Sequence, residues 1–266
     1  MQAGHDAPSD LRITIAQYSC PLINPPSQHG LFENKLHNIR LAIARMQPFT
    51  LAPGQAYSFW QQALAPTAGN GYRVGAMFLN HKVTTSLGGG LCQLSGLIYN
   101  LALLAGLDIQ ERHPHSIDAY GEERYIPLGR DATVAHGRKD LRFRNPHPYL
   151  VKLSLDVDEQ HAWGAVYAAQ ELGARIHIET QLLETMPSPR HALRDTSVPA
   201  GQVITEPGLS GKHVRAWRVV ERPGQALQRE PLSTDHYRAT PTWLRRRDTL
   251  LGPWIHKLLA RLDLHG

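Results

Sequence analysis

The sequence places a cysteine directly after three consecutive glycines, in the run from Gly88 to Ser95. Glycine adopts backbone angles that other residues avoid, so this run predicts a tight turn. The spacing of the apolar residues that follow predicts a helix that starts at Cys92. A cysteine in the first helical turn faces unpaired N–H groups and the positive end of the helix dipole, which lower its pKa and favour the thiolate. The N–H groups around Leu91 to Gln93 could also stabilise the oxyanion formed when that thiolate attacks a carbonyl.

Two other interpretations of the glycine run stay open. Cys92 could be a small apolar residue packed at a helix start, beside glycines that only turn tightly. A phosphate-binding loop is the weaker alternative, because the Lys-Ser or Lys-Thr pair that follows the glycines of a P-loop is absent. The glycine run alone therefore does not indicate catalysis, which also requires a base near Cys92.

A pair of histidines supplies candidate partners in the segment Glu111 to Ser116. Side chains alternate along a strand, so a strand here would put His113 and His115 on one face. Either imidazole could act as the general base for Cys92, while the other positions the substrate. We favour His115 as the base because it borders Ser116 and a predicted loop. Most of the 15 histidines in the chain must have ordinary roles.

The third segment with chemical potential runs from Gly129 to Val134. Asp131 could orient an imidazole and complete a Cys-His-Asp arrangement, and Arg130 could hold a substrate carboxylate through a bidentate pair. The ordinary alternative is a surface ion pair that closes a turn. Besides these groups, the residues that we expect to bind substrate flank the cysteine and the histidines: Gly89, Gly90, Gln93, Ser95, Ser116 and Arg130.

Zinc is a competing use of the same side chains, because one thiolate, two imidazoles and a carboxylate are acceptable ligands. The sequence lacks the Cys-x-x-Cys pairs and helical histidine spacing of common zinc sites, so we predict no metal and no other cofactor. Only two cysteines occur, Cys20 and Cys92. One disulfide is formally allowed, but the glycine-rich setting of Cys92 favours a reactive thiol.

The fold that must position these residues is predicted to be α+β. We expect antiparallel strands packed around a central helix that starts at Cys92, and a mostly β C-terminal part. The hydrophobic spacing predicts helices at Glu33–Met46 and Cys92–Ala105, the second capped by Gly106. Strands are expected at Val74–Leu79, Val83–Leu87, Leu107–Ser116, Ala132–Ala135, Leu141–Asn145, Tyr149–Val157, Val166–Ala169 and Arg175–Thr180, with a hairpin of Val214–Glu221 and Leu227–Leu232.

Four parts are expected along the chain. Residues 1–30 form an N-terminal segment and loop, and residues 31–185 form the domain that carries the candidate site. A linker over 186–198, rich in proline and serine, leads to a β-hairpin extension over 199–240. A basic amphipathic helix over 241–266 follows, which could lie on a membrane surface or dock on its own domain.

The composition narrows the classes of partner and compartment. The formal charge is +5, but much of the excess lies near Arg245 to Arg247, and no aromatic platform accompanies it, so a nucleic-acid role is disfavoured. The sequence has no run of 18 apolar residues, so it predicts no membrane-spanning segment. Residues Met1 to Asp10 lack the basic and apolar regions of a secretory signal. From the residues alone we expect a cytoplasmic protein, or one whose export segment is missing.

The segment from Leu31 to about Val157 resembles the VanW domain, named after an accessory protein of glycopeptide-resistance clusters. The resemblance rests on three blocks together: Gly-Gly-Gly-x-Cys-Gln from Gly88, Arg-His-x-His-Ser from Arg112, and Gly-Arg-Asp-Ala-Thr-Val from Gly129. The hairpin over 208–238 resembles the C-terminal part of longer family members. The resemblance implies a location in the cell envelope and, for some members, peptidoglycan L,D-transpeptidase activity with the motif cysteine, here Cys92.

Two functions follow as expectations. The first is cysteine-dependent acyl transfer on a peptidoglycan-type peptide, with Cys92 as nucleophile, His115 or His113 as base and Asp131 as its orienting group. The second is a non-catalytic binding or accessory protein that recognises cell-wall peptides or glycopeptide-like ligands. In that case the glycines and Arg130 form a carboxylate-binding nest and Cys92 is only packed. In both cases the expected partner is a cell-wall peptide or a peptidoglycan precursor.

Overall fold

The computed structural model describes residues 11–22, 29–47, 49–79, 82–121 and 124–247. In that part of the chain the helices are α1 (His29–Met46), α2 (Phe59–Ala63) and α3 (Leu91–Leu104). The strands are β1 (Ile13–Pro21), β2 (Phe49–Leu51), β3 (Ala56–Ser58), β4 (Val74–Leu79), β5 (Lys82–Leu87), β6 (Asp108–Glu111), β7 (Arg142–Arg144), β8 (Val151–Val157), β9 (His161–Ala168), β10 (Arg175–Met186), β11 (Arg190–Arg194), β12 (Val203–Glu206), β13 (Gly211–Glu221), β14 (Gln228–Tyr237) and β15 (Thr242–Arg246).

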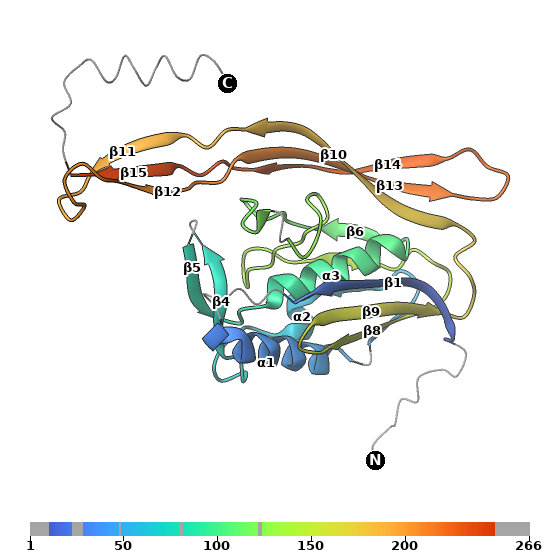
Figure 1. The fold of residues 1–266 in the computed structure, drawn as a ribbon. Helices are drawn as coiled ribbons and strands as arrows, with labels where there is room; N and C mark the ends of the chain where they lie inside the picture. The colour runs from blue at the N-terminus through green and yellow to red at the C-terminus, as the bar shows by residue number, and fades with distance from the viewer. Residues whose placement is uncertain (1–10, 23–28, 48, 80–81, 122–123, 248–266) are drawn as a thin grey trace.

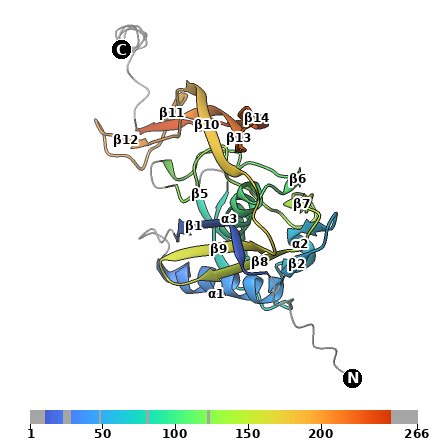
Figure 2. The same ribbon diagram turned by 90° about the vertical axis from the view of Figure 1, so that its right-hand side faces the viewer.

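The fold is mixed and rich in β-structure, with several antiparallel sheets. A four-stranded sheet has the order β1-β9-β8-β2, and three-stranded sheets have the orders β10-β13-β14, β11-β15-β12 and β3-β7-β6. Strands β4 and β5 form a separate hairpin. Figures 1 and 2 show α3 between α1 and the long layer of β10, β13 and β14. The predicted helix over Glu33–Met46 and the predicted strands over Val74–Leu87 are confirmed.

The four-stranded sheet follows from simple alternation of residues. In β8 every second side chain is buried, and Ala162, Val166 and Ala168 of β9 face the core in the same way. Such a period of two is expected of strands with one buried face. Strand β1 pairs with β9 from Ile13 to Pro21, and Cys20 is buried. The N-terminal segment was therefore wrongly separated from the following domain, since it supplies an edge strand of its sheet.

The triple glycine serves as the turn between β5 and α3. Gly88 and Gly90 have positive φ angles of 80° and 104°. Residues with a Cβ rarely adopt such angles. A Cβ on Gly89 would lie 2.5 Å from the backbone carbon of Gly75 in β4. The helix then begins at Leu91, one residue before the predicted start, and most of its side chains are buried. Close backbone packing thus fixes where the first turn of α3 lies.

A buried amide ties this turn to α1. Asn38, on α1, is fully buried and donates from Nδ2 to the carbonyl oxygens of Gly89 (3.0 Å) and Arg73 (2.9 Å). Its Oδ1 accepts from the Arg73 N–H at 2.8 Å. Since a buried polar group is costly unless it is paired, these three bonds favour one relative position of α1 and the glycine turn.

The C-terminal part confirms one prediction and corrects two. The hairpin expected near Val214–Leu232 is present as the antiparallel pair β13 and β14. The expected linker over 186–198 contains β11, which pairs in parallel with β15. Thr242–Arg246 is strand β15, so the expected C-terminal helix does not begin at 241, and residues 248–266 of that prediction lie outside the described residues. Neither segment has an apolar alternation that would predict a strand, since the apolar residues of each are adjacent and β11 is exposed throughout.

Near the candidate site, one predicted strand is too long and another is not formed. The strand expected over Leu107–Ser116 ends at Glu111, before either histidine. The strand expected over Ala132–Ala135 is irregular, apart from an isolated bridge between Ala135 and Lys139. Both segments are held by hydrogen bonds to side chains and to each other, described below, which no hydrophobic period reveals.

The close approach of Gly89 to β4 gives a first prediction. Gly89→Ala should lower the free energy of unfolding by about 1–3 kcal/mol, because the added Cβ meets backbone that cannot move aside cheaply. Gly30→Ala is the matched control, since a Cβ at Gly30 meets nothing within 4 Å. Urea unfolding followed by circular dichroism measures both. Equal midpoints for the two variants would contradict the packing described for the glycine turn.

Candidate active site

Cys92 lies in the first turn of α3, at the wall of a pocket. Its Sγ is 3.3 Å from Thr133 Oγ1 and 3.6 Å from the carbonyl oxygen of Val134. The side chain is partly buried, and the pocket that it lines has a volume of about 660 Å³. The cysteine is therefore accessible from a space large enough for part of a peptide.

His115 links Cys92 to Asp131. Its Nδ1 lies 2.6 Å from Asp131 Oδ2, and its backbone N–H donates to the same oxygen at 2.8 Å. Its ring also lies close enough to the Cys92 thiol for each group to shift the pKa of the other. Since Nδ1 is engaged by the carboxylate, Nε2 is the ring atom left to exchange a proton with sulfur. The three side chains thus stand in the order expected of a nucleophile, its base and the group that orients the base.

The electrostatics of the three groups favour a thiolate and an imidazolium. Burial by itself would raise the pKa of Cys92, but the hydrogen bond and charge of His115, with Thr133 and Val134, outweigh it and leave this pKa lowered. Burial would likewise lower the pKa of His115, yet Asp131 and Cys92 raise it to about 10. The proton therefore resides on the ring near neutral pH, and the sulfur is poised as a nucleophile.

The Asp131 carboxylate is held by two further donors besides those of His115. Arg112 Nη2 donates to Oδ1 at 3.2 Å, and Tyr237 donates its hydroxyl proton to Oδ1 at 2.5 Å. Arg112 is itself fixed by Asp235, whose two oxygens accept from Nη1 at 2.6 and 2.7 Å. Burial would raise the pKa of Asp131, but His115 and Arg112 hold it well below its usual range. The carboxylate thus stays charged and in one orientation.

Helix α3 positions the segment that carries Asp131. Ser95 Oγ donates to the carbonyl oxygen of Ala132 at 2.6 Å, and Asn100 Nδ2 donates to that of Arg130 at 2.9 Å. Both side chains are fully buried. The neighbouring Thr133 N–H donates to the carbonyl oxygen of His113 at 2.8 Å, which joins this segment to the histidine segment. One helix therefore carries both the cysteine and the supports of the aspartate.

Several predicted residues have other surroundings than expected. The His113 ring lies 3.0 Å from Glu111 Oε1 and does not line the pocket, so it is not brought to Cys92. Arg130 Nε donates to Asn100 Oδ1 at 2.8 Å, its guanidinium covers the Tyr18 ring, and the residue does not line the pocket. Ser95 is buried and bonded to backbone, so its hydroxyl is not presented to a ligand.

Other predicted substrate-binding residues do line the pocket: Gly89, Gly90, Gln93 and Ser116. Gln93 Nε2 donates to the carbonyl oxygen of Pro21 at 2.5 Å, and its Oε1 is buried with no partner among the described residues. The nearby Cys20 thiol is buried, which raises its pKa to about 11. At neutral pH it is thus a poor nucleophile beside Cys92.

The backbone donors near the cysteine are fewer than expected. The Leu91 N–H donates to the carbonyl oxygen of Gly88 at 3.2 Å, and that of Gln93 donates to Gly90 at 3.0 Å. For the Cys92 N–H no backbone acceptor is found within the described ranges. Of the three expected oxyanion donors, this one alone has no backbone acceptor among the described residues.

Four residues of the site were not predicted from the sequence: Arg112, Thr133, Asp235 and Tyr237. Arg112 and Thr133 lie within the motif blocks, but neither has a type or spacing that marks it as a support. Asp235 and Tyr237 lie on β14, more than 100 residues from Asp131 along the chain. Their alternation places both on one face of that strand, which is the signal that could have indicated a shared role.

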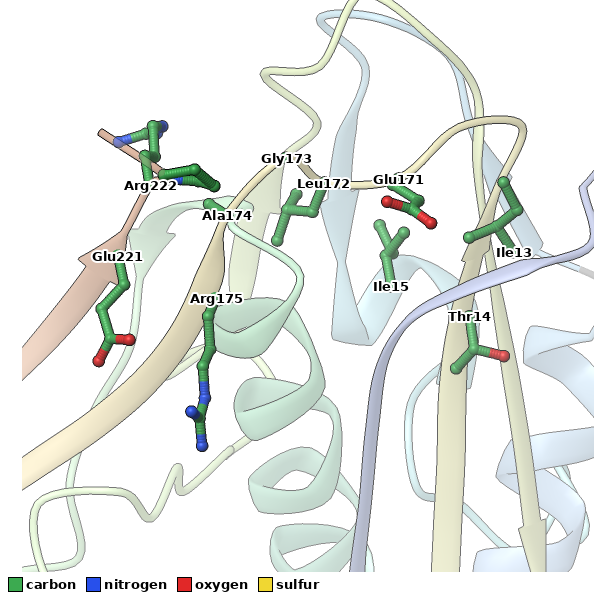
Figure 3. A pocket seen from close by; sticks show the side chains of 11 residues that line it. Ile13, Thr14, Ile15, Glu171, Leu172, Gly173, Ala174, Arg175, Glu221 and Arg222 are labelled. Atoms are coloured by element: carbon green, nitrogen blue, oxygen red, sulfur yellow. The ribbon is translucent and has the colours of Figure 1, made fainter. Parts of the chain in front are cut away.

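In the part of the chain that the structure describes, no group of three or more His, Cys, Asp or Glu side chains is arranged to hold a metal ion, and no helix there is long and apolar enough to cross a membrane. A second pocket, of about 690 Å³, is lined by the start of β1, the turn between β9 and β10, and the end of β13 (Figure 3). No cysteine or histidine lines it.

The hydrogen bond from Tyr237 gives a second prediction. Tyr237→Phe removes one donor to a buried carboxylate and the acceptor of the Gly129 N–H, so the free energy of unfolding should fall by about 1.5–3 kcal/mol. Tyr167→Phe is the control, because the Tyr167 hydroxyl, on β9, has no hydrogen-bond partner within the described residues. Urea unfolding compares the two. A Tyr237→Phe protein as stable as wild type would show that this bond does not hold Asp131.

Comparison with known proteins gives a family match over the region that holds the site. The family model described as "VanW like protein" matches residues 34–167, half of the chain, which include Cys92, His115 and Asp131. A structure titled "Crystal structure of HP0197-G5" is 20% identical, covers 27% of this chain and 97% of that chain, and has a TM-score of 0.16.

Two curated proteins are similar over part of their length. The Vancomycin B-type resistance protein VanW of Enterococcus faecalis is 31% identical over 160 residues, which cover 59% of this chain and 58% of that protein. The uncharacterized protein YoaR of Bacillus subtilis is 32% identical over 122 residues, which cover 45% of this chain and 39% of that protein. The chain thus spans about half the length of these relatives. On the match of its family model, the chain belongs to the VanW family.

Proposed function

We propose that this chain is a cysteine-dependent acyl transferase that acts on a peptide of the peptidoglycan type, in the manner of an L,D-transpeptidase. The observation that supports it most is the continuous arrangement of Cys92, His115 and Asp131 at the wall of an open pocket. An activated thiolate, a protonated imidazole and a fixed carboxylate are the groups that acyl transfer needs. Helix α3 is proposed as the support around which the site is organised.

In the first step the Cys92 thiolate attacks the carbonyl carbon of the donor peptide. The oxyanion that forms lies near the N–H of Cys92, at the positive end of α3. When the carbon–nitrogen bond breaks, the His115 imidazolium gives its proton to the leaving amine. The products of this step are a free amine and a thioester on Cys92, with His115 neutral.

In the second step an acceptor amine attacks the thioester carbonyl. Neutral His115 takes a proton from this amine as the new carbon–nitrogen bond forms and the carbon–sulfur bond breaks. Thiolate and imidazolium are restored, so the cycle closes. Water in place of the amine gives hydrolysis. Asp131 stabilises the charged ring throughout and keeps Nε2 directed to sulfur.

The cell-wall setting is proposed from the relatives. One similar protein is named as a vancomycin resistance protein, which supports a cell-wall-related role for this chain. The proposed partners are a cell-wall peptide or a peptidoglycan precursor, and the proposed place of action is the cell envelope. The motif residues lie in the region shared with that relative's family, so the two proteins are expected to share the site.

The experiment is the detection of an acyl-enzyme. Purified protein is mixed with a synthetic cell-wall-type tetrapeptide, quenched in acid and measured by intact-mass spectrometry. We expect an acyl adduct on Cys92 that is absent in Cys92→Ala. His115→Ala should slow its formation by about 10²–10⁴-fold, the usual contribution of a general base. His113→Ala is the matched control and should leave the rate near that of wild type, because this ring bonds Glu111 instead.

The rival function predicts a different pattern. A non-catalytic binding module would bind the tetrapeptide with the same affinity in wild type and Cys92→Ala, as measured by calorimetry, and would form no adduct. An equal loss of rate in His113→Ala and His115→Ala would also contradict the assignment of His115 as the base.

A further inference from the structure

The pocket beside Cys92 is lined by more cationic than acidic side chains. Its lining holds five lysine or arginine side chains and two aspartates. Charged residues on the wall of a pocket focus the local field and select ligands of the opposite sign. Whether this excess can act on a ligand depends on which of the cations are already neutralised by carboxylates.

Both aspartates of the lining are occupied. Asp131 is bonded to His115, Arg112 and Tyr237, as described above. Asp118 is buried and bonds Lys212 at 2.5 Å and Arg124 at 2.9 Å. Neither carboxylate is therefore left to compensate the remaining cations of the pocket.

Three of these cations form what we term the cationic rim: Arg138, Lys139 and Arg238. Arg138 and Arg238 are exposed, and Lys139 is partly exposed. Within the described residues none of the three makes an ion pair with a carboxylate. They come from two distant parts of the chain, the turn after Ala135 and the end of β14, and they meet at one pocket.

The backbone under the rim is fixed and lies close to the nucleophile. Lys139 and Ala135 exchange two backbone hydrogen bonds of 2.8 and 2.9 Å, and the carbonyl oxygen of Lys139 accepts from Trp60 Nε1 at 2.8 Å. The Arg238 N–H donates to the carbonyl oxygen of Ser116, next to His115, at 2.8 Å. Val134, one residue before the turn, contacts the Cys92 sulfur. The rim is thus held against both sides of the site.

We propose that the cationic rim binds a carboxylate of the peptide substrate and so selects acidic peptides for the acyl transfer at Cys92. The inference rests on the proposed function and adds the class of substrate. Arginine forms paired hydrogen bonds with a carboxylate, and two of the three rim residues are arginines. The rim takes the role expected of Arg130, which bonds Asn100 through Nε and does not line the pocket.

The first test uses two reagents that alkylate Cys92 and differ in charge. Iodoacetate is an anion and iodoacetamide is neutral, so the ratio of their rate constants reports the field at the sulfur. Each rim cation replaced by glutamine should lower this ratio by about twofold, and the triple variant Arg138→Gln, Lys139→Gln, Arg238→Gln by about five- to tenfold, from Coulomb's law in water at roughly 10 Å. The effect should shrink in high salt.

Arg190→Gln is the matched control, because Arg190 is exposed on β11 and does not line the pocket. It should leave the ratio unchanged. An unchanged ratio in the triple variant would overturn the inference. The proposed function is tested separately, by the rate constant of wild-type Cys92 with iodoacetamide. If wild-type Cys92 reacts with iodoacetamide no faster than a free cysteine, the activated nucleophile is contradicted instead.

The second test concerns the carboxylate itself. An acidic tetrapeptide should protect Cys92 from iodoacetamide, and the same peptide with its carboxyl groups amidated should protect at least fivefold less. The triple variant should lose this preference. Equal protection by the acid and the amide would overturn the inference. Protection by inorganic phosphate but not by the acidic peptide would overturn the assignment to carboxylates.

Discussion

The buried carboxylate of Asp131 is the group on which the rest of the site depends. It accepts hydrogen bonds from Arg112 and His115, which lie in one segment, and from Tyr237 on the distant strand β14. A buried charge is tolerated only when it is paired and bonded, so these donors must be in place for the segment to fold. Once they are, His115 is held in one orientation and its charge is stabilised beside Cys92.

Two elements of the fold, α3 and β14, hold this carboxylate in place. Helix α3 holds the segment around Asp131 through Ser95 and Asn100, and the same helix carries Cys92 at its start. Strand β14 supplies Asp235 and Tyr237, although it lies outside residues 34–167, the region that the family model matches. The C-terminal strands are therefore part of the site's support. The close packing of Gly89 on β4 fixes the position of the helix start and hence of the sulfur.

The sequence predicted the residues whose chemistry is local and missed those whose role depends on distant contacts. Cys92 was found from the glycines before it, and His115 and Asp131 from the residue types in their blocks. His113 and Arg130 do not line the pocket, because His113 bonds Glu111 and Arg130 bonds Asn100, and the sequence indicates neither contact. The helices and the hairpins with clear periods were predicted well. The irregular segments 112–119 and 129–135 were not, since side-chain hydrogen bonds rather than hydrophobic spacing shape them.

The central claim is that Cys92, His115 and Asp131 form one charged unit, and the titration of His115 tests it most directly. The ring of His115 can be followed by NMR as a function of pH in wild type and in Cys92→Ala. The account predicts a pKa of about 10 in wild type, because Asp131 and Cys92 both favour the imidazolium. It predicts a lower pKa in Cys92→Ala, because the hydrogen bond and charge of the thiolate are lost. A His115 that titrates near the unperturbed value of about 6.5 in both proteins would contradict the account.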